Sequence, residues 1–185
     1  MESTVIWTEE FVKSLEWKKF EEVCAEFLKI KNYDAGMTCV GADGGIDVLV
    51  KEEDGTIIAI AQCKAFGSKR VGVSLIRELF GVMASEKVEQ GLFFTTSTFS
   101  DDAVEFAKNK PISLVDLKAF VGLVNGLEGD SRQRLYKVVA QGDFTVPTCV
   151  RCNVKMIKRV ARDTQKAFWG CPNYPKCKIT MNVRT

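Results

Sequence analysis

A β-hairpin signal in the middle of the chain constrains its fold more than any other feature. Two apolar runs flank Asp54-Gly55, a dipeptide typical of a two-residue hairpin turn. If these two residues form the loop and neither strand carries a bulge, Asp47 faces Gln62 across the hairpin. Lys64 follows Gln62 by two residues and therefore lies on the same face of the sheet. The pattern predicts a carboxylate, an amide and an ammonium group on one patch of an otherwise apolar hairpin.

These three side chains fit metal-dependent phosphodiester chemistry. Mg²⁺ (or Mn²⁺) binds oxygen ligands, which Asp47, Gln62 and a backbone carbonyl between Gln62 and Lys64 would supply. Such an ion polarises a phosphate and activates a water molecule, which Lys64 would orient. Glu21, in the first predicted helix, is an additional carboxylate if that helix packs near the open end of the hairpin. From the pattern alone, an ordinary ion pair between Asp47 and Lys64 beside a surface glutamine explains the same residues equally well.

Composition limits the class of protein and the chemistry available to it. A chain of 185 residues with 46% hydrophobic and 27% charged residues has room for one soluble globular domain and a small module. Residues 1–19 show no secretory signal and no segment is long enough to cross a bilayer, so we expect a cytoplasmic protein with no membrane association. Histidine is absent, which excludes nucleases with a catalytic histidine, zinc hydrolases with histidine ligands and Ser-His or Cys-His nucleophiles.

The order of predicted elements indicates an α/β sandwich around a central mixed sheet. Residues 125–145 are the predicted linker, with a short helix over 132–140, between a first domain at 1–124 and a small module at 146–185. Apolar periodicity and capping residues predict helices over 8–31, 73–86, 100–109 and 116–124, and strands over 37–40, 91–96 and 112–115 in addition to the hairpin.

The C-terminal module differs from the rest in charge and in cysteine content. Residues 146–185 hold nine basic and one acidic residue, a net charge of +8, which leaves −6 for residues 1–145. A basic segment on an acidic body favours a polyanionic partner, although a solvated tail that binds nothing has the same composition. Two closely spaced cysteine pairs, Cys149-x2-Cys152 and Cys171-x5-Cys177, predict one structural Zn²⁺. The other cysteines fall in apolar elements and are interpreted as core residues: Cys24, Cys39 and Cys63.

Residues 147–182 resemble the four-cysteine zinc ribbons at the C-terminus of bacterial type IA topoisomerases. The resemblance rests on the two cysteine pairs, Met156 and the run Phe168-Trp169-Gly170-Cys171-x2-Tyr174-Pro175-x-Cys177. It implies binding of single-stranded DNA. Trp169 and Tyr174 are candidates to stack on bases, while Lys158, Arg159 and Lys176 are candidates to follow the phosphate backbone. One or two of the aromatic side chains can instead form the small core of the ribbon itself.

Residues 8–124 resemble Mrr-type restriction endonucleases, a branch of the PD-(D/E)xK nuclease superfamily. The matching motifs are Phe20-Glu21, Asp43-x-Gly45-Ile46-Asp47-Val48, Gln62-Cys63-Lys64 and Thr95-Thr96-x3-Ser100-x2-Ala103-x3-Ala107. The resemblance implies a restriction-endonuclease-like fold in which Asp47, Gln62 and Lys64 are the catalytic residues and Glu21 contributes. Asp43 is interpreted as a loop residue, and Thr95 and Thr96 as structural.

Together these features predict a Mg²⁺-dependent DNA endonuclease of restriction, defence or DNA processing, with a zinc ribbon that delivers DNA. A homodimer is plausible, because one active site per chain cuts one strand. Two alternatives stay open: a catalytically silent DNA-binding or adaptor protein, and a junction-resolving or repair nuclease.

Overall fold

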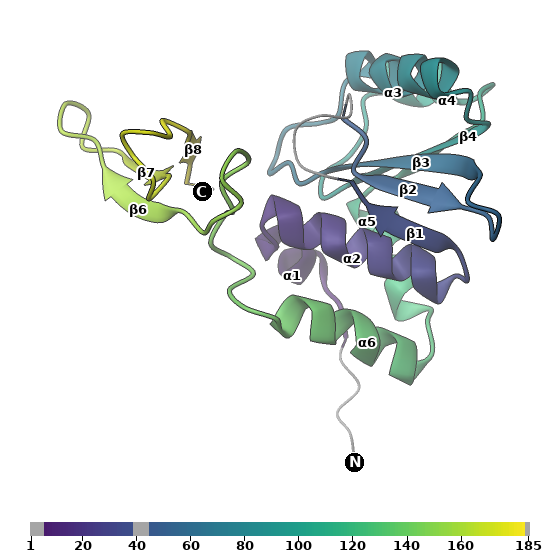
Figure 1. Ribbon diagram of the computed structural model, residues 1–185, viewed down its shortest axis with the longest axis horizontal. Coiled ribbons are helices and arrows are strands. Elements are labelled where there is room, and N and C mark those ends of the chain that lie inside the picture. Colours follow the sequence, from purple (N-terminus) through teal and green to yellow (C-terminus); the bar gives the residue numbers. More distant parts are fainter. Residues whose placement is uncertain (1–5, 39–44, 184–185) are drawn as a thin grey trace.

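The computed structural model describes residues 6–38 and 45–183, so Asp43 and Cys39 lie outside the described residues. Helices and strands alternate along the first two thirds of the chain, and a small β module ends it (Figure 1). In order, the elements are α1 (Glu9–Ser14), α2 (Trp17–Ile30), β1 (Asp34–Met37), β2 (Val48–Lys51), β3 (Ile57–Lys64), α3 (Val73–Glu86), β4 (Gln90–Thr95), α4 (Asp101–Ala107), β5 (Ile112–Val115), α5 (Leu117–Asn125), α6 (Gly129–Ala140), β6 (Ile157–Val160), β7 (Ala167–Gly170) and β8 (Thr180–Asn182).

The central sheet is mixed and has five strands in the order β1-β2-β3-β4-β5. β1, β2 and β3 pair antiparallel, whereas β3, β4 and β5 pair parallel. In Figure 1, α3 and α4 lie on one face of the sheet, and α2 and α6 lie on the other. Two buried apolar clusters correspond to these faces, one including Phe20 and Phe120 and the other including Ile76 and Phe93. The predicted α/β fold around a mixed sheet is confirmed.

The first predicted helix, over 8–31, is wrong as a single element because the chain leaves the helical conformation at Leu15 and Glu16. Leu15 has an extended backbone, with φ −64° and ψ 129°. Glu16 is the N-cap of α2, where its side chain accepts a hydrogen bond from the N–H of Lys18. The N–H of Glu16 donates to the carbonyl of Phe144 at 2.7 Å, a partner 128 positions away that local periodicity cannot reveal. The predicted strand over 37–40 begins earlier, at Asp34, and is described only to Met37.

The hairpin has the predicted register from Val48 to Val50, although the predicted turn is wrong. Its loop contains three residues, Glu53 to Gly55, because Glu52 and Thr56 form the closing pair. Gly55 has φ +87°, as the last residue of such a loop requires. This longer loop shifts the strand pairing by one residue, and a bulge that leaves Ile58 unpaired shifts it back.

Because of this compensation, Val48 pairs with Ala61, one step from the predicted Asp47–Gln62 pair. The predicted pair itself does not form, since the N–H of Asp47 donates at 3.0 Å to the carbonyl of Ala61, the partner of Val48. Two expectations therefore fail, the two-residue loop and the absence of a bulge, and their effects on register cancel.

The segment predicted as a linker packs against the first domain. Its predicted short helix is α6, whose Leu135 and Val139 are buried in the same apolar cluster as Phe20 and Phe27 of α2. Phe144, which follows the C-terminal end of α6 in the chain, packs edge-on against Phe11. Residues 129–144 therefore cover α1 and α2 instead of crossing solvent.

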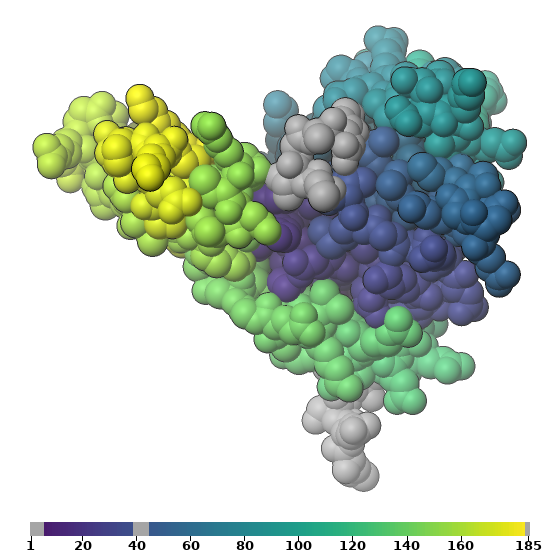
Figure 2. Space-filling model, viewed as in Figure 1, coloured from purple at the N-terminus to yellow at the C-terminus, as the bar shows by residue number. Residues whose placement is uncertain are grey.

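The C-terminal module is a three-stranded antiparallel sheet in the order β6-β7-β8. In Figure 2 it forms a lobe beside the main body, in contact with it. Trp17, the first residue of α2, donates from Nε1 to the carbonyl of Thr148 at 2.7 Å, and Lys18 hydrogen-bonds to Asn153. Contacts to the start of α2 thus place the module. Among the described residues, no helix combines the length and apolar character needed to span a membrane.

Candidate active site

Asp47 is fixed at the open end of the hairpin by its backbone and by its side chain. The carbonyl of Asp47 accepts a hydrogen bond from the N–H of Thr38 at 3.1 Å. Its Oδ2 accepts from the backbone N–H of Cys63 at 2.6 Å, between the two other residues of the predicted catalytic set. A carboxylate held in this way has one defined position relative to the end of β3, where Gln62 and Lys64 lie.

Glu21 lies next to Asp47, as predicted from the resemblance. It belongs to the buried face of α2, with 9% of its surface exposed, and its side chain hydrogen-bonds to Asp47. Burial, followed by the negative charge of Asp47, raises the pKa of Glu21 to about 8. Burial also raises the pKa of Asp47, although the N–H of Cys63 and the charge of Lys64 oppose that effect. The pair therefore holds two carboxyl groups with too little positive charge around them for both to ionise readily.

Lys64 lies at the end of β3 and provides the positive charge nearest to this pair. Its ammonium group lowers the pKa values of both Glu21 and Asp47. The carbonyl of Lys64 accepts from the hydroxyl of Thr95 at 2.9 Å and from the N–H of Thr96 at 3.2 Å. Both threonines are fully buried, and the hydroxyl of Thr96 donates to the carbonyl of Phe66. They thus hold the strand end that presents Lys64.

Gln62 is only 2% exposed, and its Oε1 has no hydrogen-bond partner among the described residues. Its Nε2 points to Gly45, where a Cβ atom would come within 2.7 Å of it. Gly45 also has φ +89°, a left-handed conformation that disfavours any side chain. Oε1 of Glu78, on α3, would lie 3.6 Å from the same Cβ position. Gln62 therefore packs on the side of Gly45 and Glu78 of α3, whereas Asp47 contacts Glu21 of α2.

These residues fit a divalent cation. A buried amide oxygen without a partner is unfavourable unless something binds it, and oxygen is the atom that Mg²⁺ prefers. Two neighbouring carboxyl groups with raised pKa values would both be stabilised in their charged form by such an ion. The structure thus brings Asp47, Glu21 and Lys64 together, whereas Gln62, which was predicted to share a face with Asp47, packs toward Gly45 and α3. Sequence reasoning missed Glu78, because nothing in the pattern of α3 indicates which of its exposed residues faces Gly45.

The four predicted zinc ligands converge in the C-terminal module. The Sγ atoms of Cys149, Cys152, Cys171 and Cys177 all lie within 4.8 Å of one another. Those of Cys149 and Cys177 are 3.7 Å apart, and a tetrahedral site with Zn–S bonds of about 2.3 Å has edges of about 3.8 Å. Burial acts to raise the pKa of Cys149, but hydrogen bonds from the backbone of Cys152 and Arg151 outweigh it and lower the pKa to about 7. The donor set fits Zn²⁺, which binds thiolates.

The residues predicted to bind DNA lie at different depths in this module. Tyr174 is 62% exposed, and the guanidinium of Arg159 lies 5.9 Å from the centre of its ring. Lys158 and Lys176 are exposed. Trp169 is half-buried against the cysteine cluster and pairs with Lys158 across β6 and β7. Of the two aromatic candidates, Tyr174 is the exposed one.

Comparison with known proteins gives a family match over the first domain. Residues 12–124 match the family model Mrr_cat, described as a restriction endonuclease. No curated protein matches the sequence.

Three solved structures are similar to the chain at low sequence identity. The first is a protein of unknown function, AF1548, at 18% identity, with a TM-score of 0.45, 55% of this chain covered and 58% of that chain. The DNA modification-dependent restriction endonuclease AspBHI has 16% identity and a TM-score of 0.45, with 76% of this chain and 44% of that chain covered. MspJI restriction endonuclease, solved in complex with a 27-mer oligonucleotide, has 17% identity and a TM-score of 0.44, with 72% of this chain and 34% of that chain covered. The chain spans less than two thirds of the length of each.

Proposed function

Because this chain belongs to the Mrr_cat restriction endonuclease family, we propose that it is a metal-dependent endodeoxyribonuclease that hydrolyses phosphodiester bonds in restriction, defence or DNA processing. The observation that carries the proposal is the group at the open end of the hairpin. Asp47 and Glu21 share a hydrogen bond beside Lys64, and Gln62 offers a buried oxygen with no partner among the described residues. A chain that kept only the fold would have no reason to retain two poorly neutralised carboxyl groups there.

Asp47, Oε1 of Gln62 and the carbonyl of Cys63 are the groups that would hold Mg²⁺ or Mn²⁺. The ion, when bound, polarises the scissile phosphate and lowers the pKa of a water ligand. Lys64 contributes a fixed positive charge for the phosphoryl oxygens. Glu21, whose pKa without the ion is about 8, holds a proton against Asp47 at neutral pH.

The C-terminal module would bind the DNA, with single-stranded DNA as the form that its resemblance implies. Support comes from its net charge of +8 and from Tyr174, whose exposed ring stacks with Arg159. Aromatic rings and cations together bind single strands with little sequence preference. One Zn²⁺ at the four cysteines would hold this surface together.

Cleavage of plasmid DNA in the presence of Mg²⁺ or Mn²⁺ tests the proposal. Methylated, unmethylated, branched and single-stranded DNA should be compared, since the signal for cleavage is unknown. We expect Asp47→Ala and Lys64→Ala each to reduce cleavage by about 100-fold or more. Lys108→Ala, which removes an exposed lysine on α4, is the control and should cleave normally. No cleavage of any substrate would favour the adaptor alternative, whereas metal-independent cleavage would contradict the proposed cation.

A further inference from the structure

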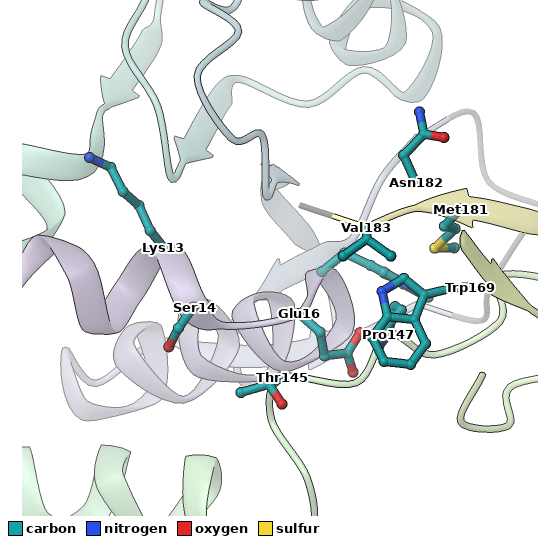
Figure 3. Close-up of a pocket in the computed structure, with 10 residues that line it drawn as sticks. Lys13, Ser14, Glu16, Thr145, Pro147, Trp169, Met181, Asn182 and Val183 are labelled. Atoms are coloured by element: carbon teal, nitrogen blue, oxygen red, sulfur yellow. The ribbon is translucent and has the colours of Figure 1, made fainter. Parts of the chain in front are cut away.

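A cavity of about 360 Å³ lies between the α1–α2 turn and the C-terminal module, away from the proposed active site (Figure 3). This volume lies at the lower end of the range of about 300–1,000 Å³ typical of small-molecule sites. Its lining is mainly apolar and comes from both parts of the chain. The lining includes Trp17 and Ser14 from the first domain, Pro147 from the connection, and Trp169, Met181 and Asn182 from the module.

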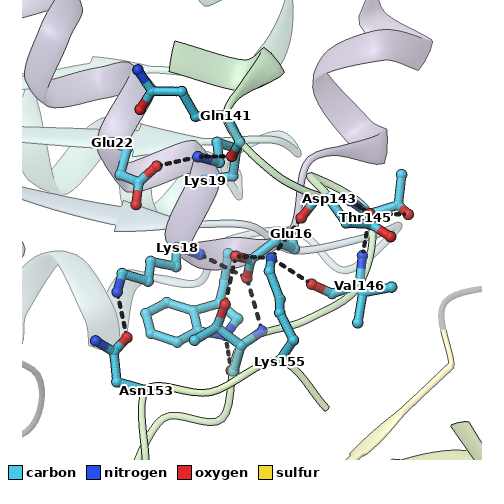
Figure 4. Close-up of polar contacts among 12 residues, drawn as sticks. Glu16, Lys18, Lys19, Glu22, Gln141, Asp143, Thr145, Val146, Asn153 and Lys155 are labelled. Atoms are coloured by element: carbon cyan, nitrogen blue, oxygen red, sulfur yellow. Dashed lines mark hydrogen bonds and ion pairs between the residues drawn. The ribbon is translucent and has the colours of Figure 1, made fainter. Parts of the chain in front are cut away.

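The walls of the cavity are held in place by the buried carboxylate of Glu16 (Figure 4). Oε2 of Glu16 accepts from the N–H groups of Lys18 and Thr148, at 3.1 and 3.2 Å. Oε1 accepts from the hydroxyl of Thr148 at 2.9 Å and from Nζ of Lys155 at 3.1 Å. With four donors on its two oxygens, the carboxylate is fully used.

The polar groups that remain lie at the side of the cavity. Asn182 is exposed, and its amide is directed away from Trp169 in Figure 3. The hydroxyl of Ser14 is engaged with the carbonyl of Phe11 at 2.6 Å. An occupant would therefore meet indole and other apolar surface, with Lys13, Thr145 and Asn182 as the other polar residues of the lining.

We propose that this cavity holds one unstacked nucleobase of the bound DNA, an inference that rests on the proposed nuclease function. The occupant must suit two features that rarely coincide. It must present a flat apolar surface to Trp169 and Trp17, and it must belong to a polyanion, because the module that forms one wall carries a net charge of +8. A nucleobase on its phosphate backbone has both properties. The amide of Asn182 would then meet the polar edge of the base.

A duplex with a single extrahelical thymine tests this assignment. Its binding is compared with that of the same duplex carrying an abasic residue at the bulge, so that charge and length are equal. All proteins carry Lys64→Ala to prevent cleavage, and affinities are measured by fluorescence anisotropy. We expect the thymine bulge to bind roughly 5- to 100-fold more tightly than the abasic bulge.

Filling the cavity with larger side chains should remove the preference for the thymine bulge over the abasic bulge. The double variant Ser14→Leu/Asn182→Leu narrows it from both sides without touching the Glu16 contacts, and its folding is checked by thermal unfolding. Thr164→Leu, on an exposed turn of the same module, is the control and should keep the preference.

Three results would overturn the inference, and they differ in what else they affect. Equal binding of the two duplexes shows that no base is recognised, while the nuclease proposal stands. A preference that survives filling assigns the base to another surface and leaves the cavity to an apolar side chain of a protein partner. No binding of any DNA by the chain contradicts the proposed function as well.

Discussion

The hydroxyl of Thr148 donates to the buried carboxylate of Glu16 at 2.9 Å, which joins the start of α2 to the residue before Cys149. The same helix carries Glu21, whose side chain hydrogen-bonds to Asp47. One helix therefore contacts both the cysteine cluster region and the candidate catalytic residues. The position of the C-terminal module relative to the candidate active site is set by this helix and not by a free tether.

Replacing Glu16 with alanine should loosen the module while leaving the first domain folded. The change leaves Lys155 and Thr148 without their buried acceptor, and loss of such charged hydrogen bonds costs about 2–3 kcal/mol. We expect faster cleavage by trypsin around residues 141–158 and a separate unfolding transition of the module. Glu10→Ala, at an exposed position of α1, is the matched control and should change the free energy of unfolding by less than about 0.5 kcal/mol.

Cys171→Ser should abolish zinc binding and reduce DNA affinity while the first domain stays folded. Each of the four thiolates completes the tetrahedral site, and a module of this size has too little apolar core to fold without it. The zinc content after gel filtration measures the loss of zinc, and the circular dichroism spectrum shows that the first domain stays folded. DNA affinity is measured separately. Cys24→Ala, which removes a buried thiol of α2, should retain one zinc per chain. Unchanged DNA binding after zinc loss would contradict the proposed role of the module.

Gly45→Ala should impair both stability and cleavage, and Gly55→Ala should impair stability alone. Both residues have positive φ, which costs about 1–2 kcal/mol for alanine. Only at Gly45 would the new Cβ come within 2.7 Å of Gln62, whereas nothing lies within 4 Å at Gly55. The difference between the two variants in the cleavage rate, at equal loss of stability, measures how far the position of Gln62 matters. Equal rates would show that it does not.

Stability without metal should fall as the pH rises from about 4.5 through about 8. Glu21 has a folded-state pKa raised from 4.5 to about 8, so in this range the folded chain keeps a proton that the unfolded chain has lost. Each pKa unit corresponds to about 1.4 kcal/mol, which gives a loss of a few kcal/mol overall. Glu21→Gln should reduce the difference in the free energy of unfolding between pH 6 and pH 8, measured by denaturant titration.

Added Mg²⁺ should restore more stability at pH 8 than at pH 6, because the ion and the proton compete for the same carboxyl groups. The loss of stability with rising pH and the gain of stability from Mg²⁺ are separable in one set of urea titrations. An equal gain from Mg²⁺ at both pH values, with Glu21 intact, would argue against a cation beside Glu21 and Asp47.

The sheet was largely predictable because it follows from short-range patterns, whereas Glu21 entered the candidate site only through the family resemblance. Alternating apolar strands gave the hairpin, and the caps Ser100 and Asp116 correctly predicted the starts of α4 and α5. The break before Glu16 was not predictable, because its cause is a hydrogen bond to Phe144 near the other end of the chain. The contact of Glu78 with the Gly45 region is likewise a product of packing between α3 and the hairpin, which no spacing within α3 records.

The bulge at Ile58 divides the hairpin into two mechanically independent halves. Toward the tip the strands follow the register that the three-residue loop dictates, and toward Asp47 they follow a register one residue away from it. A length change at the tip can therefore be absorbed by gaining or losing this bulge, without turning Gln62 and Lys64 to the opposite face. A change of length at the tip, which carries the exposed Glu53 and Asp54, would thus leave the register next to the candidate active site unaltered.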